Sequence, residues 1–354
     1  MKQLKTAVVG LHMGLNFHVK RITEHPGFQL IALCDINRAK LDEACATYGV
    51  AGYTDFYEMI LDVKPDLVVI ASPTNFHHDH AIYAMEHGVD VFLEKPMANN
   101  AVEAQEIADC MSRTGRKLMI YQPHRTFSDC LAVSAAIQSG LMGKIFTIKR
   151  RDACYFIRDN WQAYRKNGGG TLYNRGSHYF DECIMLSGGV PVKSNCILTR
   201  VLARGDADDC FKAIIKTDND MLLDIEMIMA TAYKCVPWEI FGEKGTAVQT
   251  KDAQGRDVIR VRYYAEDPAD CPVCRYLTTA DPACETADAP WAIKDFPLED
   301  YGPLNIYDLC YDYYALDKAP FVPVSETLTV MKTLDACWED AGGVIYINSV
   351  DLSD

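Results

Sequence analysis

Leu67-Val68-Val69-Ile70-Ala71, followed at once by Ser72-Pro73-Thr74, is the stretch that decides the fold. Five apolar residues in a row predict a strand buried on both faces, which is typical of a parallel sheet covered by helices on each side. A helix pattern follows over 78–87 and ends at Gly88. This unit of strand, loop and helix recurs from residue 6 to residue 123. The sequence therefore predicts an α/β fold whose first domain is a doubly wound parallel sheet.

The neighbouring segments repeat the unit and then depart from it. We expect further strands at 6–9, 29–34, 89–93 and 117–121, with helices at 17–24, 41–48, 56–61 and 103–113. Beyond a helix at 127–139, alternating apolar and polar residues predict strands at 145–151, 193–202, 210–217, 222–229, 236–241, 245–250 and 258–263. Helices are expected at 305–318 and 325–341, and a long excursion at 265–304. We predict two domains, 1–123 and 124–354, the second an α+β domain with a large, mostly antiparallel open sheet.

Composition narrows the class of protein. The 354 residues carry a net charge of −14 with no basic tract, so no nucleic-acid partner is expected. No apolar run is long enough to span a membrane, and the N-terminus does not resemble a signal peptide, so we expect a cytoplasmic protein. Most of the 14 cysteines stand singly in apolar runs, as buried thiols do. We predict no metal; the alternative is a zinc site at Cys271, Cys274 and Cys284, which lacks a second C-x-x-C pair.

The first strand ends in the turn Gly10-Leu11-His12-Met13-Gly14. A dinucleotide-binding turn reads G-x-G-x-x-G, because glycines make room for a pyrophosphate at the helix N-terminus. Here His12 replaces the second glycine and Gly14 comes one residue early. An ordinary strand-to-helix turn is therefore the alternative to cofactor binding by Gly10, His12, Met13 and Gly14.

Asp35, at the end of the second predicted strand, favours the dinucleotide reading. A carboxylate there binds the adenosine ribose, although it also serves as a helix cap, a role open to Asn37. Because a carboxylate repels a 2′-phosphate, we expect NAD as the cofactor rather than NADP. Arg38 lies close enough in sequence to leave NADP open.

Polar residues follow two neighbouring strands at the edge where a parallel sheet binds ligands. After the strand at 67–71, the loop Ser72-Pro73-Thr74-Asn75 and His77 are expected to lie under the nicotinamide end of the cofactor. After the strand at 89–93 comes Glu94-Lys95-Pro96. The Lys95 ammonium is suited to orient a substrate hydroxyl and to stabilise alkoxide charge. A surface lysine is the simpler alternative.

The segment from Gly168 to Asp181 begins with three glycines and contains Asn174 and His178. Glycines permit close approach of the backbone, and residues four apart in a helix point the same way. An imidazole titrates near neutrality and is suited to remove a hydroxyl proton, so His178 is the candidate general base. Asn174 is expected to bind substrate or to orient His178.

With these motifs the chain resembles the Gfo/Idh/MocA oxidoreductases, which include glucose-fructose oxidoreductase and inositol 2-dehydrogenase. The resemblance extends over nearly the whole chain, and Glu94-Lys95-Pro96 and the Gly168–Asp181 segment are its most specific pieces. It implies a Rossmann domain, a C-terminal domain whose open sheet often forms oligomer contacts, and hydride transfer between NAD(P) and a ring carbon. A carbohydrate or cyclitol substrate and a homodimer or homotetramer are therefore expected.

The resemblance also assigns residues. Lys95 and His178 occupy the catalytic positions, and with Asn174 they are expected to contact substrate. Arg125 lies where the family often has an arginine on the substrate or the cofactor side, and Trp161 lies in a segment that often contacts the cofactor or the substrate. We expect both, with Gln122, to bind the cofactor. Tyr155 is a further candidate for substrate contact, with packing as the alternative. Many members carry Asp where this chain has Asn174, and members with Asn there resemble nucleotide-sugar and glycoside 3-dehydrogenases, which tilts the expectation toward C3. Two alternatives stay open: a glycosidase that uses retained NAD for transient oxidation, and a non-catalytic nucleotide-sensing subunit.

Overall fold

A computed structural model describes residues 3–265 and 291–347. Its first sheet has six strands, all parallel, in the order β3-β2-β1-β4-β5-β6. Every residue of β4 and β6 is buried, so both faces of the sheet are covered and the apolar run at 67–71 is explained. The doubly wound sheet is confirmed. Its strands are β1 (Leu4–Val9), β2 (Phe28–Cys34), β3 (Ala51–Tyr53), β4 (Leu67–Ile70), β5 (Asp90–Glu94) and β6 (Leu118–Tyr121).

The crossover helices of this sheet end where the sequence indicates. Gly49 and Gly115 adopt the left-handed conformation just after two of them, as helix C-termini favour. Asn37 and Asp55 accept hydrogen bonds from the first backbone N–H groups of α3 and α4. The helices are α1 (Leu11–Gly14), α2 (Lys20–Glu24), α3 (Arg38–Tyr48), α4 (Phe56–Val63), α5 (His77–Glu86) and α6 (Ala101–Thr114).

The helix after β1 contains a π-helical turn, Leu15–Val19, between α1 and α2. Such turns are frequent at functional sites because they redirect side chains on either side of the extra residue. Here Phe17 is 40 % exposed while His18 is completely buried. Phe17 of this π-helical turn therefore lines a cleft between the two sheets, whereas the next residue, His18, packs in the interior.

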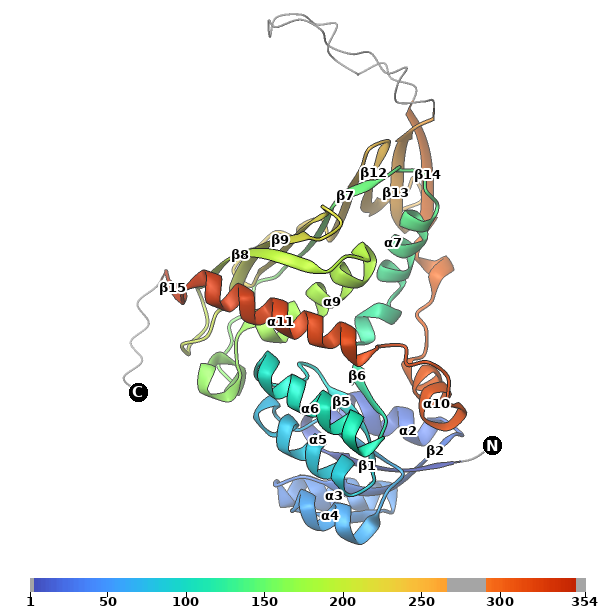
Figure 1. The fold of residues 1–354 in the computed structure, drawn as a ribbon, viewed down its shortest axis with the longest axis vertical. Coiled ribbons are helices and arrows are strands. Elements are labelled where there is room, and N and C mark those ends of the chain that lie inside the picture. The colour runs from blue at the N-terminus through green and yellow to red at the C-terminus, as the bar shows by residue number, and fades with distance from the viewer. Residues whose placement is uncertain (1–2, 266–290, 348–354) are drawn as a thin grey trace, which may run out of the picture.

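The second sheet has nine strands in the order β14-β13-β12-β11-β7-β10-β9-β8-β15. All its pairs are antiparallel except β10 with β7 and β15 with β8. The helices α7, α9 and α11 lie along one face (Figure 1), which confirms the open, mostly antiparallel sheet. The elements are β7 (Ile145–Ala153), β8 (Pro191–Arg200), β9 (Cys210–Thr217), β10 (Leu222–Ile228), β11 (Trp238–Gly242), β12 (Gly245–Lys251), β13 (Asp257–Tyr264), β14 (Trp291–Pro297), β15 (Val344–Tyr346), α7 (Ser128–Gln138), α8 (Thr171–Asn174), α9 (Gly176–Ser187), α10 (Ile306–Leu316) and α11 (Val324–Ala341).

Three strands were not expected from the sequence. The edge strands β3 and β15 are three residues each, too short to show a periodicity. The strand β14 lies inside the segment 265–304, which was wrongly expected to be an excursion throughout. Its pairing with β13, from Val258↔Pro297 to Tyr264↔Trp291, makes it the edge strand of the second sheet.

The chain returns to the first sheet near its C-terminus. Helix α10 packs there through the Tyr307 hydroxyl, 2.7 Å from His18 Nδ1, and through the Tyr314 hydroxyl, which donates to the carbonyl of Val91. Helix α11 then crosses between the two sheets and contacts both α6 and α9 (Figure 1). Segments distant in sequence thus hold the two halves of the molecule in one arrangement. Over the described part of the chain, none of the helices has the length and apolarity needed to traverse a bilayer.

Candidate active site

A cleft of about 380 Å³ opens between the carboxyl edge of the first sheet and the helix face of the second. Lys95, Asn174 and His178, the three residues expected to be catalytic, all line it. The remaining lining residues are His12, Met13, Phe17, Arg21, Glu94, Tyr121, Pro123, His124, Phe127, Arg158, Asn160, Trp161, Gln162 and Arg175. A smaller adjoining cavity shares Met13, Lys95 and Trp161 and adds the loop after β4. The cleft therefore joins the proposed chemical groups to the edge where a dinucleotide binds.

Lys95 follows β5 directly and reaches across to the second domain. Its Nζ donates to the side-chain Oδ1 of Asn174 at 2.8 Å and to the backbone carbonyl of the same residue at 3.0 Å. The amide nitrogen of Asn174 donates to Gln162 Oε1, so the Asn174 oxygen is the atom that must face the ammonium. The peptide bond between Lys95 and Pro96 is cis. These contacts fix the ammonium at the floor of the cleft.

Asn174 does not orient His178, which was one of the two roles expected of it. Asn174 ends α8, His178 lies in the first turn of the separate helix α9, and the Asn174 side chain is bonded to Lys95 and Gln162 instead. The partner of His178 is Gln122, whose Oε1 lies 2.9 Å from Nδ1. Gln122 was assigned to the cofactor side, but its amide group contacts the imidazole and the backbone of Ser177.

This hydrogen-bond pattern sets the tautomer of His178. The Gln122 amide nitrogen donates to the carbonyl of Ser177 at 3.3 Å, so its oxygen faces His178 and must accept a proton. Nδ1 of His178 therefore carries the hydrogen, and Nε2 presents a lone pair. A neutral imidazole held in this way is a proton acceptor.

Burial and positive neighbours keep both ionisable groups ready for proton transfer. Burial lowers the pKa of His178 well below its ordinary value, and His124, Lys95 and Arg175 lower it further. Burial also lowers the pKa of Lys95 to about 8, although Glu94 opposes that shift. Near neutral pH the site thus contains a neutral imidazole and an ammonium ion.

Glu94 is a buried anchor for this arrangement. Its Oε1 lies 3.0 Å from His18 Nε2, and its Oε2 accepts from the backbone N–H of Lys95 at 3.1 Å. Through Tyr307 of α10, His18 connects this carboxylate to the C-terminal segment. His18, in the π-helical turn before α2, therefore contacts Glu94, and Glu94 in turn holds the backbone of Lys95.

The glycine run at 168–170 approaches other parts of the chain closely. A Cβ on Gly169 would lie 2.4 Å from the carbonyl oxygen of Gln162, and one on Gly170 would lie 2.4 Å from Oδ1 of Asp208. Gly170 also has a φ of 116°, which L side chains rarely adopt. The close approach that these glycines permit is thus to the chain itself. This close approach packs α8 against Asp208. Burial raises the pKa of the Asp208 carboxyl to about 6.

The carboxyl edge of the first sheet fits a dinucleotide. Gly10 turns with a φ of 88° directly against the carbonyl of Ala71, where a Cβ would lie 2.3 Å away. The oxygens of Asp35 accept from Leu11 N at 2.7 Å and Asn37 N at 2.8 Å, and each retains a lone pair for a ribose hydroxyl. Asn37, not Asp35, caps α3. This places a carboxylate beside the N-terminus of α1.

Other residues assigned to the cofactor side lie along the same edge. His12 is exposed and, with Met13 and Trp161, faces the cleft. His77 is buried with its ring nitrogens each 2.9 Å from a carbonyl oxygen, those of Pro96 and Ser72, so it joins two loops. Ser72 and Thr74 line the adjoining cavity, whereas Gly14 is buried in α1 and Pro73, Asn75 and Arg38 are exposed. Arg38 forms an ion pair with Asp42 at 2.9 Å.

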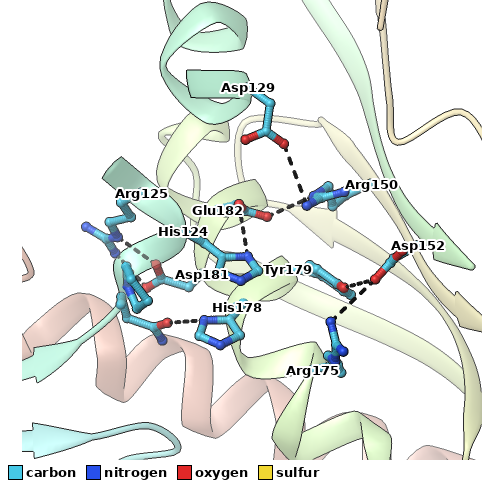
Figure 2. Close-up of polar contacts among 12 residues, drawn as sticks. His124, Arg125, Asp129, Arg150, Asp152, Arg175, His178, Tyr179, Asp181 and Glu182 are labelled. Carbon is cyan, nitrogen blue, oxygen red and sulfur yellow. Dashed lines mark hydrogen bonds and ion pairs between the residues drawn. The ribbon is translucent and has the colours of Figure 1, made fainter. Parts of the chain in front are cut away.

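Two expected site residues lie elsewhere. Arg125 is buried and pairs with both oxygens of Asp181, at 2.6 and 2.7 Å, and with Glu326 at 2.6 Å. Figure 2 shows its guanidinium group beside Asp181, and Arg125 is not among the residues that line the cleft. Tyr155 is 64 % exposed, forms a bridge with Ala230 and is not part of the cleft lining. The structure thus places neither Arg125, expected on the cofactor side, nor Tyr155, expected at the substrate, in the lining of the cleft.

A larger cavity of about 470 Å³ lies on the other side of the 165–169 loop, beside α11. It contains none of Lys95, Asn174 and His178, so it is not the candidate active site. Within the described residues, no group of three or more His, Cys, Asp and Glu side chains is placed to hold a metal ion. Cys271, Cys274 and Cys284, the alternative zinc site, lie outside the described residues.

Sequence reasoning missed several residues of the cleft, above all His124. Its ring is stacked on that of His178 with centroids 3.9 Å apart. Its position just after β6, at the same carboxyl edge as Lys95, was the available signal.

Comparison with known proteins agrees with the geometry. Residues 4–122 match the model of an oxidoreductase family with an NAD-binding Rossmann fold, and residues 130–248 match the GFO/IDH/MocA C-terminal domain. The chain is 29 % identical to the D-glucoside 3-dehydrogenase of Escherichia coli over 54 % of its length, and spans only 56 % of that relative. It is 25 % identical to the scyllo-inositol 2-dehydrogenase (NAD(+)) of Bacillus subtilis, over 69 % of this chain and 73 % of that one.

Among solved structures, the WlbA dehydrogenase of Bordetella pertussis in complex with NADH and UDP-GlcNAcA superimposes with a TM-score of 0.77. The superposition covers 96 % of this chain and 97 % of that one at 22 % identity, and at that identity it shows the fold alone. The two family models together cover the whole first sheet and strands β7 to β11 of the second. The chain therefore belongs to the GFO/IDH/MocA oxidoreductase family and has the NAD-binding Rossmann domain of that family.

Proposed function

We propose that this protein is an NAD-dependent dehydrogenase that oxidises a secondary alcohol on the ring of a sugar, glycoside or cyclitol, with C3 of a glycoside as the favoured position. The observation that carries the proposal is the convergence of Lys95, Asn174 and the neutral His178 on one cleft at the carboxyl edge of the first sheet. In the division of labour that we propose, residues 1–123 hold the cofactor and residues 124–354 hold the substrate and form oligomer contacts.

The protein's part of the reaction is proton transfer and charge stabilisation. Nε2 of His178 accepts the proton of the substrate hydroxyl as the carbinol C–H bond breaks and a carbonyl forms. The Lys95 ammonium donates a hydrogen bond to the same oxygen and stabilises the negative charge that develops there. Asn174 cannot relay a proton; it holds Lys95 in place. NAD, when bound, supplies the acceptor for the hydride.

The pH dependence of kcat/KM should follow the two shifted groups. His178 must be neutral and Lys95 cationic, so the rate should fall as the pH drops through the lowered pKa of His178, well under 6.5, and as it rises through the pKa of Lys95 at about 8. In E94Q the charge that raises the pKa of Lys95 is lost, so the basic limb should move to lower pH. Initial rates from pH 5 to pH 10 measure both limbs. A profile that stays level across pH 8 in both proteins would contradict this assignment.

The choice of NAD over NADP is proposed to depend on Asp35. In D35A the loss of a charged hydrogen bond to the ribose should weaken NADH binding by about 10- to 100-fold. The ratio of NADH to NADPH affinity should fall as well, because no carboxylate remains to repel a 2′-phosphate. Fluorescence titrations with both reduced cofactors measure these constants. The matched control is D62A, an exposed carboxylate at the far end of α4; equal effects in both variants would refute the role of Asp35.

Self-association is proposed to use the face of the second sheet that the helices leave open. Strand pairing places Ile197, Ile214, Leu222 and Ile293 on this face, and all four are exposed. Exposed apolar side chains of this kind mark protein–protein contacts when they are grouped. Light scattering on the purified chain tests for the expected homodimer or homotetramer, and a monomer at micromolar concentration would contradict it.

The experiment that tests the function supplies NAD with glycosides, free hexoses and inositols and follows the fluorescence of the reduced nicotinamide. Growth of the signal with one substrate class supports the dehydrogenase and identifies that class. Release of an aglycone without net NADH would instead establish the glycosidase that uses retained NAD. If NADH binds while neither product appears with any of these substrates, the proposal is overturned in favour of a nucleotide-sensing subunit.

A further inference from the structure

A second imidazole faces the cleft beside the proposed base. His124 lies in the short 3₁₀ helix Pro123–Thr126, after the last strand of the first sheet. Its ring is parallel to that of His178 within 2°, with centroids 3.9 Å apart. Both rings line the same cavity. The reaction described above gives His124 no part.

Behind His124 lies a buried carboxylate, that of Glu182 on α9. Nδ1 of His124 is 3.5 Å from Oε1 of Glu182, and neither atom has another hydrogen-bond partner among the described residues. Figure 2 shows Glu182 placed between His124 and Arg150. A hydrogen on Nδ1 of His124 is the group that would satisfy both orphaned atoms.

The charges around the pair decide where a proton goes. Two parallel rings at this distance cannot both be cations, since like charges so close oppose each other's protonation. At His178 the positive groups are Lys95, Arg175 and Arg150, whereas its own hydrogen-bond partner, Gln122, is neutral.

At His124 the nearest charge is instead negative. Burial opposes ionisation of Glu182, but Arg150 and His124 hold its pKa below the ordinary value. Glu182 also accepts a hydrogen bond from Arg150 Nε at 2.9 Å, and the other charges of the cluster have partners of their own. Arg150 also faces Asp129 at 3.9 Å, Arg125 is matched by Asp181 and Glu326, and Asp152 pairs with Arg175 at 3.7 Å and accepts from Tyr179 at 2.6 Å (Figure 2).

We propose that His124 is a positioning residue for His178: its ring fixes the plane of the catalytic imidazole, and, backed by Glu182, it takes the one positive charge that the pair can hold. His178 is thereby kept neutral with Nε2 free to accept the substrate proton. This inference rests on the proposed function, because a charge on His124 affects the reaction only if His178 acts as the base.

Two substitutions separate the effect of the His124 ring from the effect of its positive charge. H124F keeps an aromatic ring against His178 but removes the charge, so the acid limb of kcat/KM should move to higher pH by about one unit while the plateau stays close to wild type. H124A removes both the ring and the charge. The plateau of kcat/KM should therefore also fall by about tenfold, because the plane of the His178 imidazole is no longer fixed. The matched control is H87F, since His87 is also stacked on an aromatic ring, Tyr83, at 3.9 Å but lies at the far end of α5.

A titration without substrate keeps the proposal separate from the proposed activity. The imidazole signals of the unliganded enzyme are followed by NMR, with the His178 signal identified by its loss in H178A. We expect the pKa of His178 to rise by about one unit in H124F. An unchanged His178 titration in H124F overturns the charge role, and an H124A plateau equal to wild type overturns the positioning role. If the titration shifts but no substrate turns over, the proposed function fails and the paired imidazoles stand.

Discussion

Replacing Lys95 with Met is expected to lower kcat by roughly 10²- to 10³-fold, with the fold and NADH binding retained. Met has a similar length and no charge, so the variant removes the ammonium and its two hydrogen bonds to Asn174 while filling most of the same space. The loss is large because the oxygen that gains negative charge would have no cation beside it. Steady-state turnover, circular dichroism and NADH titration measure the three quantities.

The control for this variant is K117M. Lys117 also gives hydrogen bonds to the backbone, to the carbonyls of Tyr313 and Tyr314, but it lies at the opposite end of the strands from the cleft. Its loss should lower stability without lowering turnover by more than a few fold. Full activity in K95M would mean that the site is misplaced, whatever the substrate.

Much of the fold follows from local sequence, and the exceptions share a cause. A run such as 67–71 predicts its strand because burial on both faces leaves no polar alternation to misread. By contrast β3 contains Ala51 and Gly52, and β14 contains Lys294, Asp295 and Pro297, residue types that are depleted in strands. Each is fixed by pairing with a longer strand, β2 and β13, which is a tertiary effect.

The site divides in the same way. Lys95 and His178 could be predicted. Lys95 directly follows a strand of the first sheet, His178 follows a glycine run, and both lie in the segments that carry the family resemblance. His124 and Gln122 could not be predicted to contact His178, because only folding brings the end of β6 against α9. Arg125 was assigned to the cofactor side through the family resemblance, yet its side chain points into the core toward Asp181. Sequence proximity to a site does not determine which way a side chain points.

The His178→Ala variant is expected to lower kcat/KM by roughly 10²- to 10⁴-fold, the usual contribution of a positioned base. Removing the ring leaves a space beside His124 and Gln122, next to the Nε2 position from which the hydroxyl proton is taken. Added imidazole should therefore restore part of the rate in H178A, and the restored rate should follow the concentration of the neutral form as the pH is raised. In H178F the space is filled, so no rescue is expected.

These two variants separate proton transfer from packing. If His178 merely filled the cleft, H178F would retain activity and imidazole would not help H178A. The same comparison bears on Lys95, because the ammonium stabilises an oxygen only after its proton has left. Rescue of H178A by imidazole should therefore be lost when K95M is added, whereas two independent effects would leave the rescue factor unchanged. A rescue factor that is equal in H178A and in the H178A/K95M double variant would show that the two residues do not act on one oxygen.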